Sequence, residues 1–322
     1  MKTITLMHHT IFADLKEKAL DASFDEQYPE NGSFVARTIR NKVFWYYKGY
    51  TAEGDKQDKY VEPADNQEIT MRVEEFRRSK VGYKERRSLV MSLKRVLPSP
   101  DPFVGDLIEA LWKAGLFRLR GILIGTIAYQ TYAGLLGVRL PAAVVRTDDV
   151  DFAQFHSISF LVKDTMPPAL ETLQSVDRSF RALPHRSDAR ATTVFINARK
   201  FKVEFLTPNR GSNDYMGRPA KMPALGGAAA EPLRYLDFLI YEPIDSVLLH
   251  KAGIPVTVPA PQRYAVHKLI VSNVRGKREK SRKDFEQAGF LIEALMHNSM
   301  QFDLGLAWME AWDREPSGKI IS

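Results

Sequence analysis

The sequence predicts an α+β fold, and three observations lead to this prediction. The segment 32–49 is rich in β-branched and aromatic residues, and with 59–63 beyond a polar turn it is typical of an antiparallel ribbon. Helical periodicity covers 66–80 and 82–96 and returns near the end of the chain. Between these regions, short segments with strand character alternate with helical ones.

The elements are expected in the following order. A short helix over 14–24 precedes the ribbon, whose aromatic run 45–47 either packs a small core or stacks bases. The two basic helices end before Pro98, Pro100 and Pro102, which form a stiff break. Beyond the break we expect helix 102–116, strand 118–124, helix 126–137, strand structure within 144–152, helix 167–180, hairpin strands 191–196 and 200–206, a loop over 210–230, strand 234–240, a short helix over 243–251, an extended segment 256–258 and helices 261–274 and 282–297.

These elements divide the chain into three regions. Residues 1–100 hold the ribbon and the basic helices, 101–240 form a central core, and 241–322 form a C-terminal helical region. The hairpin assignment rests on the turn at 197–199, and the loop assignment for 210–230 rests on its Gly, Ala and Pro content.

Composition limits the class of protein. The chain has 322 residues, 44% of them hydrophobic and 26% charged, as in globular proteins. It contains no cysteine, which excludes disulfides, thiolate nucleophiles and iron–sulfur clusters and suits a reducing compartment. Residues 1–10 have no signal-peptide character, and the uncharged stretch 121–138 is diluted by Gly, Thr and Gln. We therefore expect a cytoplasmic protein without a membrane partner.

The positive charge is concentrated in two segments. Residues 72–95 contain nine Lys and Arg against three Glu, and 263–283 contain eight against one Glu. The whole chain carries 46 basic and 39 acidic residues, a net charge of +7, so the remainder is acidic. Such segments suit a polyanionic partner such as nucleic acid or a nucleoside triphosphate, although each alone could be a solvated helix face.

A pair of carboxylates is the strongest chemical signal. Asp149 and Asp151 alternate along a predicted strand, so both side chains share one face. Two neighbouring carboxylates repel each other unless a cation neutralises them, and oxygen ligands in this pattern suit magnesium. A solvated turn is the other reading of the pair.

Three further segments complete a candidate site. Gly125 and Thr126 follow a predicted strand and begin a helix, whose N-terminus could bind phosphate. Arg146 precedes the acidic strand and could also contact phosphate, or pair with Asp148. On the strand 201–205, Glu204 projects away from the buried face, where it would either join the two aspartates or pair with a neighbouring lysine.

This arrangement resembles the nucleotidyltransferase superfamily of the DNA polymerase β type. The matching residues are Ile124-Gly125-Thr126, Asp149-Val150-Asp151 and Glu204, with Thr126 where the superfamily has Ser or Gly. The segment 253–269, which contains Lys268, and the later Lys283-Asp284 are similar to bacterial nucleotidyltransferase-fold proteins distantly related to abortive-infection type IV toxins.

The resemblance implies a nucleotidyltransferase core of mixed sheet in region 101–240. It implies magnesium-dependent transfer of a nucleoside monophosphate from a nucleoside triphosphate to an acceptor hydroxyl, with release of pyrophosphate. Asp149, Asp151 and Glu204 would hold two Mg²⁺ ions and act in catalysis, and Gly125, Thr126, Arg146 and Lys268 would bind the nucleotide.

The acceptor stays open. It could be RNA or tRNA bound through 72–95 and 263–283, a protein hydroxyl or a small molecule. The alternative function is a nucleic-acid-binding or regulatory protein on an inactive nucleotidyltransferase fold.

Overall fold

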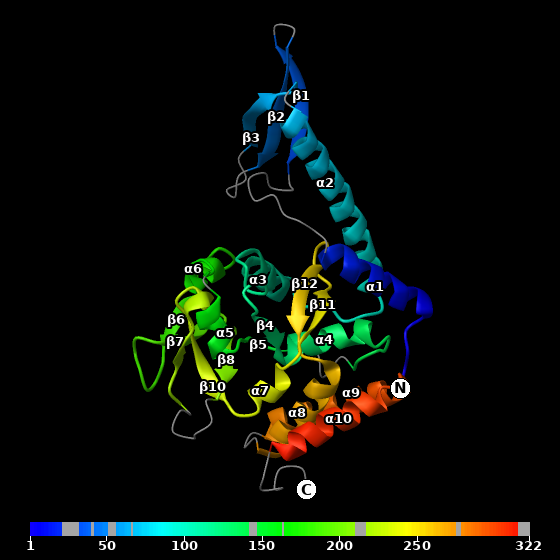
Figure 1. The fold of residues 1–322 in the computed structure, drawn as a ribbon, viewed down its shortest axis with the longest axis vertical. Helices are drawn as coiled ribbons and strands as arrows, with labels where there is room; N and C mark the ends of the chain where they lie inside the picture. Colours follow the sequence, from blue (N-terminus) through cyan, green and yellow to red (C-terminus); the bar gives the residue numbers. More distant parts are fainter. Residues whose placement is uncertain are drawn as a thin grey trace.

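A small three-stranded sheet stands at one end of the molecule, beyond a long helix (Figure 1). In this computed structural model, the described residues are 1–20, 32–39, 42–50, 56–65, 67–141, 147–162, 164–209, 217–274 and 278–314. Strands β1 (Ser33–Ile39), β2 (Lys42–Tyr50) and β3 (Lys56–Pro63) pair in antiparallel fashion, as the sequence predicts. The two basic helices expected over 66–96 form a single helix, α2 (Gln67–Leu93).

The ribbon has a small core of its own. Trp45 and Tyr47 on β2 pack with Phe34 on β1 and with Val73 and Phe76 on α2. Tyr46 projects from the opposite face, where the Arg37 guanidinium lies 4.5 Å from its ring centroid. The packing interpretation therefore holds for Trp45 and Tyr47.

A mixed sheet forms the centre of the molecule. Its strand order is β4-β5-β8-β10-β9, and β7 lies beside the start of β8 and pairs with β6. β5 and β8 run parallel, as do β8 and β10, whereas β4 is antiparallel to β5. These strands are β4 (Ile122–Ile124), β5 (Asp149–Ala153), β6 (Arg181–Pro184), β7 (Thr192–Ile196), β8 (Lys202–Pro208), β9 (Ala220–Lys221) and β10 (Ala229–Leu233).

Helices pack around this sheet, and the main hydrophobic core lies between them. The N-terminal helix is joined to the body, because Phe12 and Leu15 pack with Leu93, Ala133 and Val247. The α-helices outside the ribbon region are α1 (Leu6–Leu20), α3 (Pro102–Lys113), α4 (Gly125–Leu135), α5 (His156–Leu161), α6 (Ala169–Gln174), α7 (Leu236–Leu239), α8 (Pro261–Val274), α9 (Arg278–His297) and α10 (Gln301–Asp313). No helix among the described residues is long and apolar enough to cross a membrane.

Several expected elements differ from the structure. The loop expected over 210–230 contains the start of β10, an inner strand of the sheet, and the strand expected over 234–240 is the short helix α7. The helix expected over 243–251 is instead β11 (Ile244–Leu248), which forms a hairpin with β12 (Ile254–Val258). Short β10 is rich in alanine, and its place is set by pairing with β8 rather than by local preference.

Candidate functional site

Asp149 and Asp151 project from one face of β5. Both side chains are half-buried, whereas Val150 and Phe152 between and beyond them are buried in the core on the opposite face. The alternation of a strand therefore places the two carboxylates side by side, as the sequence predicts. The Thr147 hydroxyl donates a hydrogen bond to Asp149 Oδ1.

The glycine turn lies directly beside Asp151. β4 pairs with β5 so that Ile124 is opposite Asp151, and Gly125 follows at once as the first residue of α4. Gly125 has a φ of +69°, and a Cβ atom there would lie 2.6 Å from Asp151 Oδ2. Only glycine allows both this backbone conformation and this approach of the helix N-terminus to the carboxylate.

Thr126 lines the same pocket as Gly125 and the aspartates. It does not cap the helix, because α4 begins after Ile124 without a side-chain capping hydrogen bond. The Tyr264 hydroxyl on α8 donates to the Gly125 carbonyl oxygen at 3.0 Å and thereby fixes the turn against the C-terminal helices.

Glu204 joins the aspartates across the sheet. In the parallel pairing of β5 with β8, Asp151 lies opposite Glu204 and Asp149 lies opposite Lys202. No ion pair joins Glu204 to Lys202 within the described part of the chain. The three acids do not form a tight cluster, since they are absent from the groups of described residues whose ligand atoms all lie within 4.8 Å of one another.

The electrostatics of the site show an excess of negative charge. Burial, together with the charges of Asp149 and Glu204, raises the pKa of Asp151 from 3.8 to about 7. Burial also raises the pKa of Glu204. Nearby Lys268 and Lys280 lower the pKa of Asp151 but do not offset these effects. A cation bound between these oxygens would remove the penalty.

Basic residues of α8 and α9 face the aspartates across a pocket of about 490 Å³. Lys280 Nζ lies 3.5 Å from Asp149 Oδ2. Lys283 also lines the pocket, and burial lowers its pKa. Lys268 lines it too, but its ammonium lies 2.6 Å from Asp284 Oδ1, and both side chains are largely buried. The charge of Lys268 is thus already partnered by Asp284.

One predicted contact is untested by the structure, and one predicted surface differs from it. Arg146 lies outside the described residues, so its contact with phosphate stays a prediction. The segment 263–283 is not one exposed basic face, because Arg263 is buried and bonds to Glu310 on α10, and Lys268 and Lys280 face the pocket. Within 72–95, Arg86 is buried, whereas Lys84 and Arg87 are exposed.

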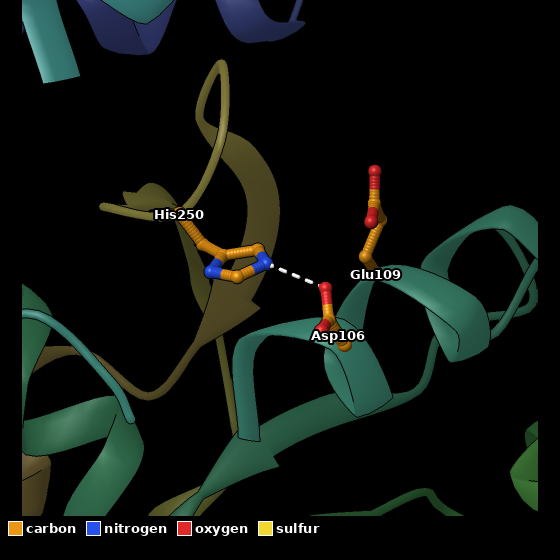
Figure 2. A group of neighbouring side chains, drawn as sticks. All are labelled: Asp106, Glu109 and His250. Carbon is orange, nitrogen blue, oxygen red and sulfur yellow. Dashed lines mark hydrogen bonds and ion pairs between the residues drawn. The ribbon is translucent and has the colours of Figure 1, made fainter. Parts of the chain in front are cut away.

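A second group of potential metal ligands lies between α3 and the turn after β11 (Figure 2). His250 Nε2 lies 2.9 Å from Asp106 Oδ1, and Glu109 lies one helical turn further along α3. Lys251 forms ion pairs with both carboxylates, and Lys113 lies 3.1 Å from Glu109. Two ammonium groups therefore already balance the two carboxylates.

The pKa shifts in this second group fit an ion-pair network. Burial alone would raise the pKa of Asp106, but the hydrogen bonds from Lys251 and His250 outweigh burial and lower it. The pKa of Lys251 is raised because its two carboxylate bonds outweigh its burial. We interpret the group as an ion-pair network that joins α3 to the β11–β12 hairpin.

Sequence reasoning assigned no site role to two basic residues of the pocket, although Lys283 belongs to the Lys283-Asp284 pair of the resemblance. Lys280 and Lys283 belong to the basic segment 263–283, but nothing singled them out as neighbours of Asp149. The sequence feature that could have indicated Lys283 is its position next to Asp284, which pairs with Lys268. The fold of α8 against α9 is what turns them toward the aspartates.

Comparison with protein families gives a match. A family model described as nucleotidyltransferase matches residues 103–313, about two thirds of the chain. The matched region begins at α3 and includes the sheet, the acidic residues and helices α8 to α10. No curated protein and no solved structure matches the chain significantly.

Proposed function

The chain belongs to the nucleotidyltransferase family, and we propose that it transfers a nucleoside monophosphate from a nucleoside triphosphate to an acceptor hydroxyl with release of pyrophosphate. The observation that carries this proposal is the contact between the Gly125 turn and Asp151, with Asp149 on the same strand face. The contact supports the proposal because a helix N-terminus suits phosphate and a pair of carboxylates suits a divalent cation.

The donor set of this site fits magnesium. Asp149 and Asp151 offer carboxylate oxygens on one face, and their mutual repulsion and that of Glu204 would be relieved by divalent cations. We propose that Asp149 and Asp151 hold two Mg²⁺ ions and that Glu204 completes the ion on the acceptor side. Magnesium held by these carboxylates would neutralise charge on the transferred phosphate and on the departing pyrophosphate.

The triphosphate would lie in the pocket between α4 and the C-terminal helices. Gly125 and Thr126 present the N-terminus of α4, and Lys280 and Lys283 line the opposite wall. The positive end of a helix and two ammonium groups suit a chain of phosphates. Lys268 supports the pocket through its bond to Asp284 and would contribute to phosphate binding from there.

Glu204 is suited to take the proton of the acceptor hydroxyl. Its carboxylate lies on the β8 side of the aspartates, beside Asp151 in the strand register, where an acceptor hydroxyl could donate its proton. In the proposed step the acceptor oxygen forms a bond to the α-phosphorus while the bond from that phosphorus to the pyrophosphate oxygen breaks. The hydroxyl proton passes to Glu204 and the electron pair of the broken bond leaves with pyrophosphate.

RNA, including tRNA, is the acceptor class that the charge of the chain favours. The net charge is +7, and Lys84 and Arg87 are exposed on α2. Binding of such an acceptor should weaken steeply with salt, because each phosphate contact releases counterions. Protein hydroxyls and small alcohols are the other acceptor classes.

Labelled nucleotides test the proposed function. Incubation of the protein with each of four α-³²P-labelled nucleoside triphosphates, magnesium and cell extract should label one class of acceptor and release unlabelled pyrophosphate. Asp149→Asn should abolish the labelling, whereas Asp188→Asn, at an exposed carboxylate away from the site, should not. An unlabelled extract with every nucleotide would favour the alternative, a regulatory protein on an inactive fold.

The resemblance to abortive-infection type IV toxins adds a cellular expectation to this proposal. If the transferred nucleotide inactivates an RNA or a protein, overproduction of the wild-type chain should arrest bacterial growth. Asp149→Asn produced to the same level should allow normal growth. Equal growth of the two strains would contradict a toxin-like role.

A further inference from the structure

A second pocket, of about 350 Å³, lies beside Glu204. β7 and β10 share the edge of β8 that faces away from β5: β7 pairs with residues 202–204 and β10 with residues 206–208 (Figure 1). The pocket lies where these two strands meet β8, and the turn after β6 contributes His185 and Arg186. We call it the outer pocket.

The outer pocket and the nucleotide pocket lie on opposite sides of the acidic residues. Across the sheet the order is β4 with Gly125, then β5 with the two aspartates, then β8 with Glu204, then β7 and β10. Neighbouring strands are about 5 Å apart, so each step along this order is one strand wide. Glu204 is therefore the residue that separates Asp151 from the outer pocket.

The geometry of phosphoryl transfer relates this strand order to the positions of the two substrates. The attacking and leaving oxygens lie in line on opposite sides of the phosphorus. With the pyrophosphate held at the N-terminus of α4 and by Lys280 and Lys283, the attacking hydroxyl must approach from the side of β8. The outer pocket is the hollow on that side which Glu204 lines.

The walls of the outer pocket carry two cations, Arg186 and Lys202, together with the carboxylates of Glu204 and Glu231. Burial raises the pKa of Glu204 and the charge of Lys202 opposes that rise, although no ion pair joins the two side chains, and the Arg186 guanidinium forms no ion pair within the described part of the chain. Glu231 is already engaged, because its Oε2 lies 2.7 Å from His185 Nε2. A guanidinium and an ammonium in one small pocket suit a phosphate group.

Both ring nitrogens of His185 form hydrogen bonds, and these bonds hold the turn after β6 in place at the edge of the outer pocket. The backbone N–H of Ser187 donates to Nδ1 at 3.2 Å, and the Ser187 hydroxyl donates to the carbonyl oxygen of Gly217. Nε2 must then carry the hydrogen that it donates to Glu231. This arrangement holds Arg186, the next residue, at the rim of the pocket.

We propose that the outer pocket binds the acceptor, and that the acceptor is an alcohol that also carries a phosphate group. The reacting hydroxyl lies over Glu204, and the phosphate lies between Arg186 and Lys202. A volume of about 350 Å³ admits a single nucleotide or sugar phosphate but no folded domain. The inference rests on the proposed function, because the direction of attack comes from it.

The end of an RNA chain and a small sugar phosphate share this chemistry, and two probes distinguish them. A 5′-fluorescein RNA hexamer with a free 3′-hydroxyl reports binding by anisotropy, and ribose 5-phosphate serves as a competitor. Arg186→Ala should weaken binding of the hexamer about tenfold, a loss of about 1.4 kcal/mol. Arg190→Ala is the matched control, since that side chain is 93% exposed and pairs with Asp188 outside the pocket.

The outcomes separate the two sources. Displacement of the hexamer by millimolar ribose 5-phosphate from the wild type but not from Arg186→Ala assigns the pocket to a sugar phosphate. Resistance to displacement, with the Arg186 effect intact, assigns it to the RNA terminus. Equal binding of both probes to Arg186→Ala and Arg190→Ala overturns the proposal, as does transfer of the labelled nucleotide to a protein hydroxyl alone.

The same preparations keep the two proposals apart. A rise in melting temperature with magnesium and nucleoside triphosphate reports the nucleotide pocket and should be equal in the wild type and both arginine variants. If the wild type shows no such rise, the proposed function fails, while the binding comparison of Arg186→Ala with Arg190→Ala still decides whether the outer pocket takes the probe.

Discussion

Replacing Asp151 by Asn should stabilise the protein in the absence of metal. The folded-state pKa of Asp151 is about 7 and the ordinary value is 3.8, a difference of about 3 units. At about 1.36 kcal/mol per unit, an ionised Asp151 costs the folded state up to about 4 kcal/mol. Movement of Lys280 and solvent screening reduce this, so we expect a gain of about 1–3 kcal/mol in the free energy of unfolding for Asp151→Asn at pH 8.

The sign of the pH dependence follows from the raised pKa. Between about pH 4 and pH 7 the unfolded chain releases the Asp151 proton, whereas the folded chain keeps it. The wild type should therefore lose stability as pH rises through this window, and Asp151→Asn should lose less. The advantage of the variant is largest at pH 8 and disappears near pH 4.

Urea denaturation followed by tryptophan fluorescence, in EDTA at pH 5, 6.5 and 8, measures this effect. Asp148→Asn, at the exposed carboxylate three residues before Asp151, is the control and should change stability little. Magnesium should then reverse the order by stabilising the wild type more than the variant. A variant that is less stable than the wild type at pH 8 without metal, or a gain independent of pH, would refute the reasoning.

Three other substitutions test parts of the site. Gly125→Ala and Gly217→Ala both place a side chain at a positive φ, but only the new methyl group at position 125 meets a neighbouring atom. Gly125→Ala should therefore lower the free energy of unfolding by about 1–3 kcal/mol more than Gly217→Ala. It should also weaken nucleotide binding as measured by calorimetry. Lys268→Met removes the ammonium group that pairs with buried Asp284 and should lower the free energy of unfolding by about 3–5 kcal/mol, and adding Asp284→Asn should restore part of that loss. Glu204→Gln should lower turnover about a hundredfold or more while nucleotide affinity changes less than about threefold; near-normal turnover would reduce Glu204 to a surface carboxylate.

Alternation and turn chemistry made much of the site predictable from the sequence. Asp149 and Asp151 lie on one strand face because strands alternate, and the same rule turns Glu204 away from buried Val203 and Phe205. The positive φ at Gly125 is a local property that a glycine between a strand and a helix signals.

The pairing of distant strands was not predictable in the same way. The parallel register that sets Glu204 opposite Asp151 joins segments about 50 residues apart, and no local pattern fixes it. β10 was not predicted because its residues have weak strand preference, and its place in the sheet depends on pairing with β8 and β9. Lys280 likewise reaches Asp149 only because α8 and α9 pack together.

The central claim is that Asp149 and Asp151 bind a magnesium–nucleotide complex. The most direct measurement is calorimetric titration of a nonhydrolysable nucleoside triphosphate into the protein, with magnesium and with EDTA, for the wild type and Asp149→Asn. We predict saturable binding by the wild type with magnesium, and binding at least about tenfold weaker with EDTA or in the variant. Binding of equal strength in all three cases would contradict the metal site, and no binding to the folded wild type would contradict the nucleotide pocket itself.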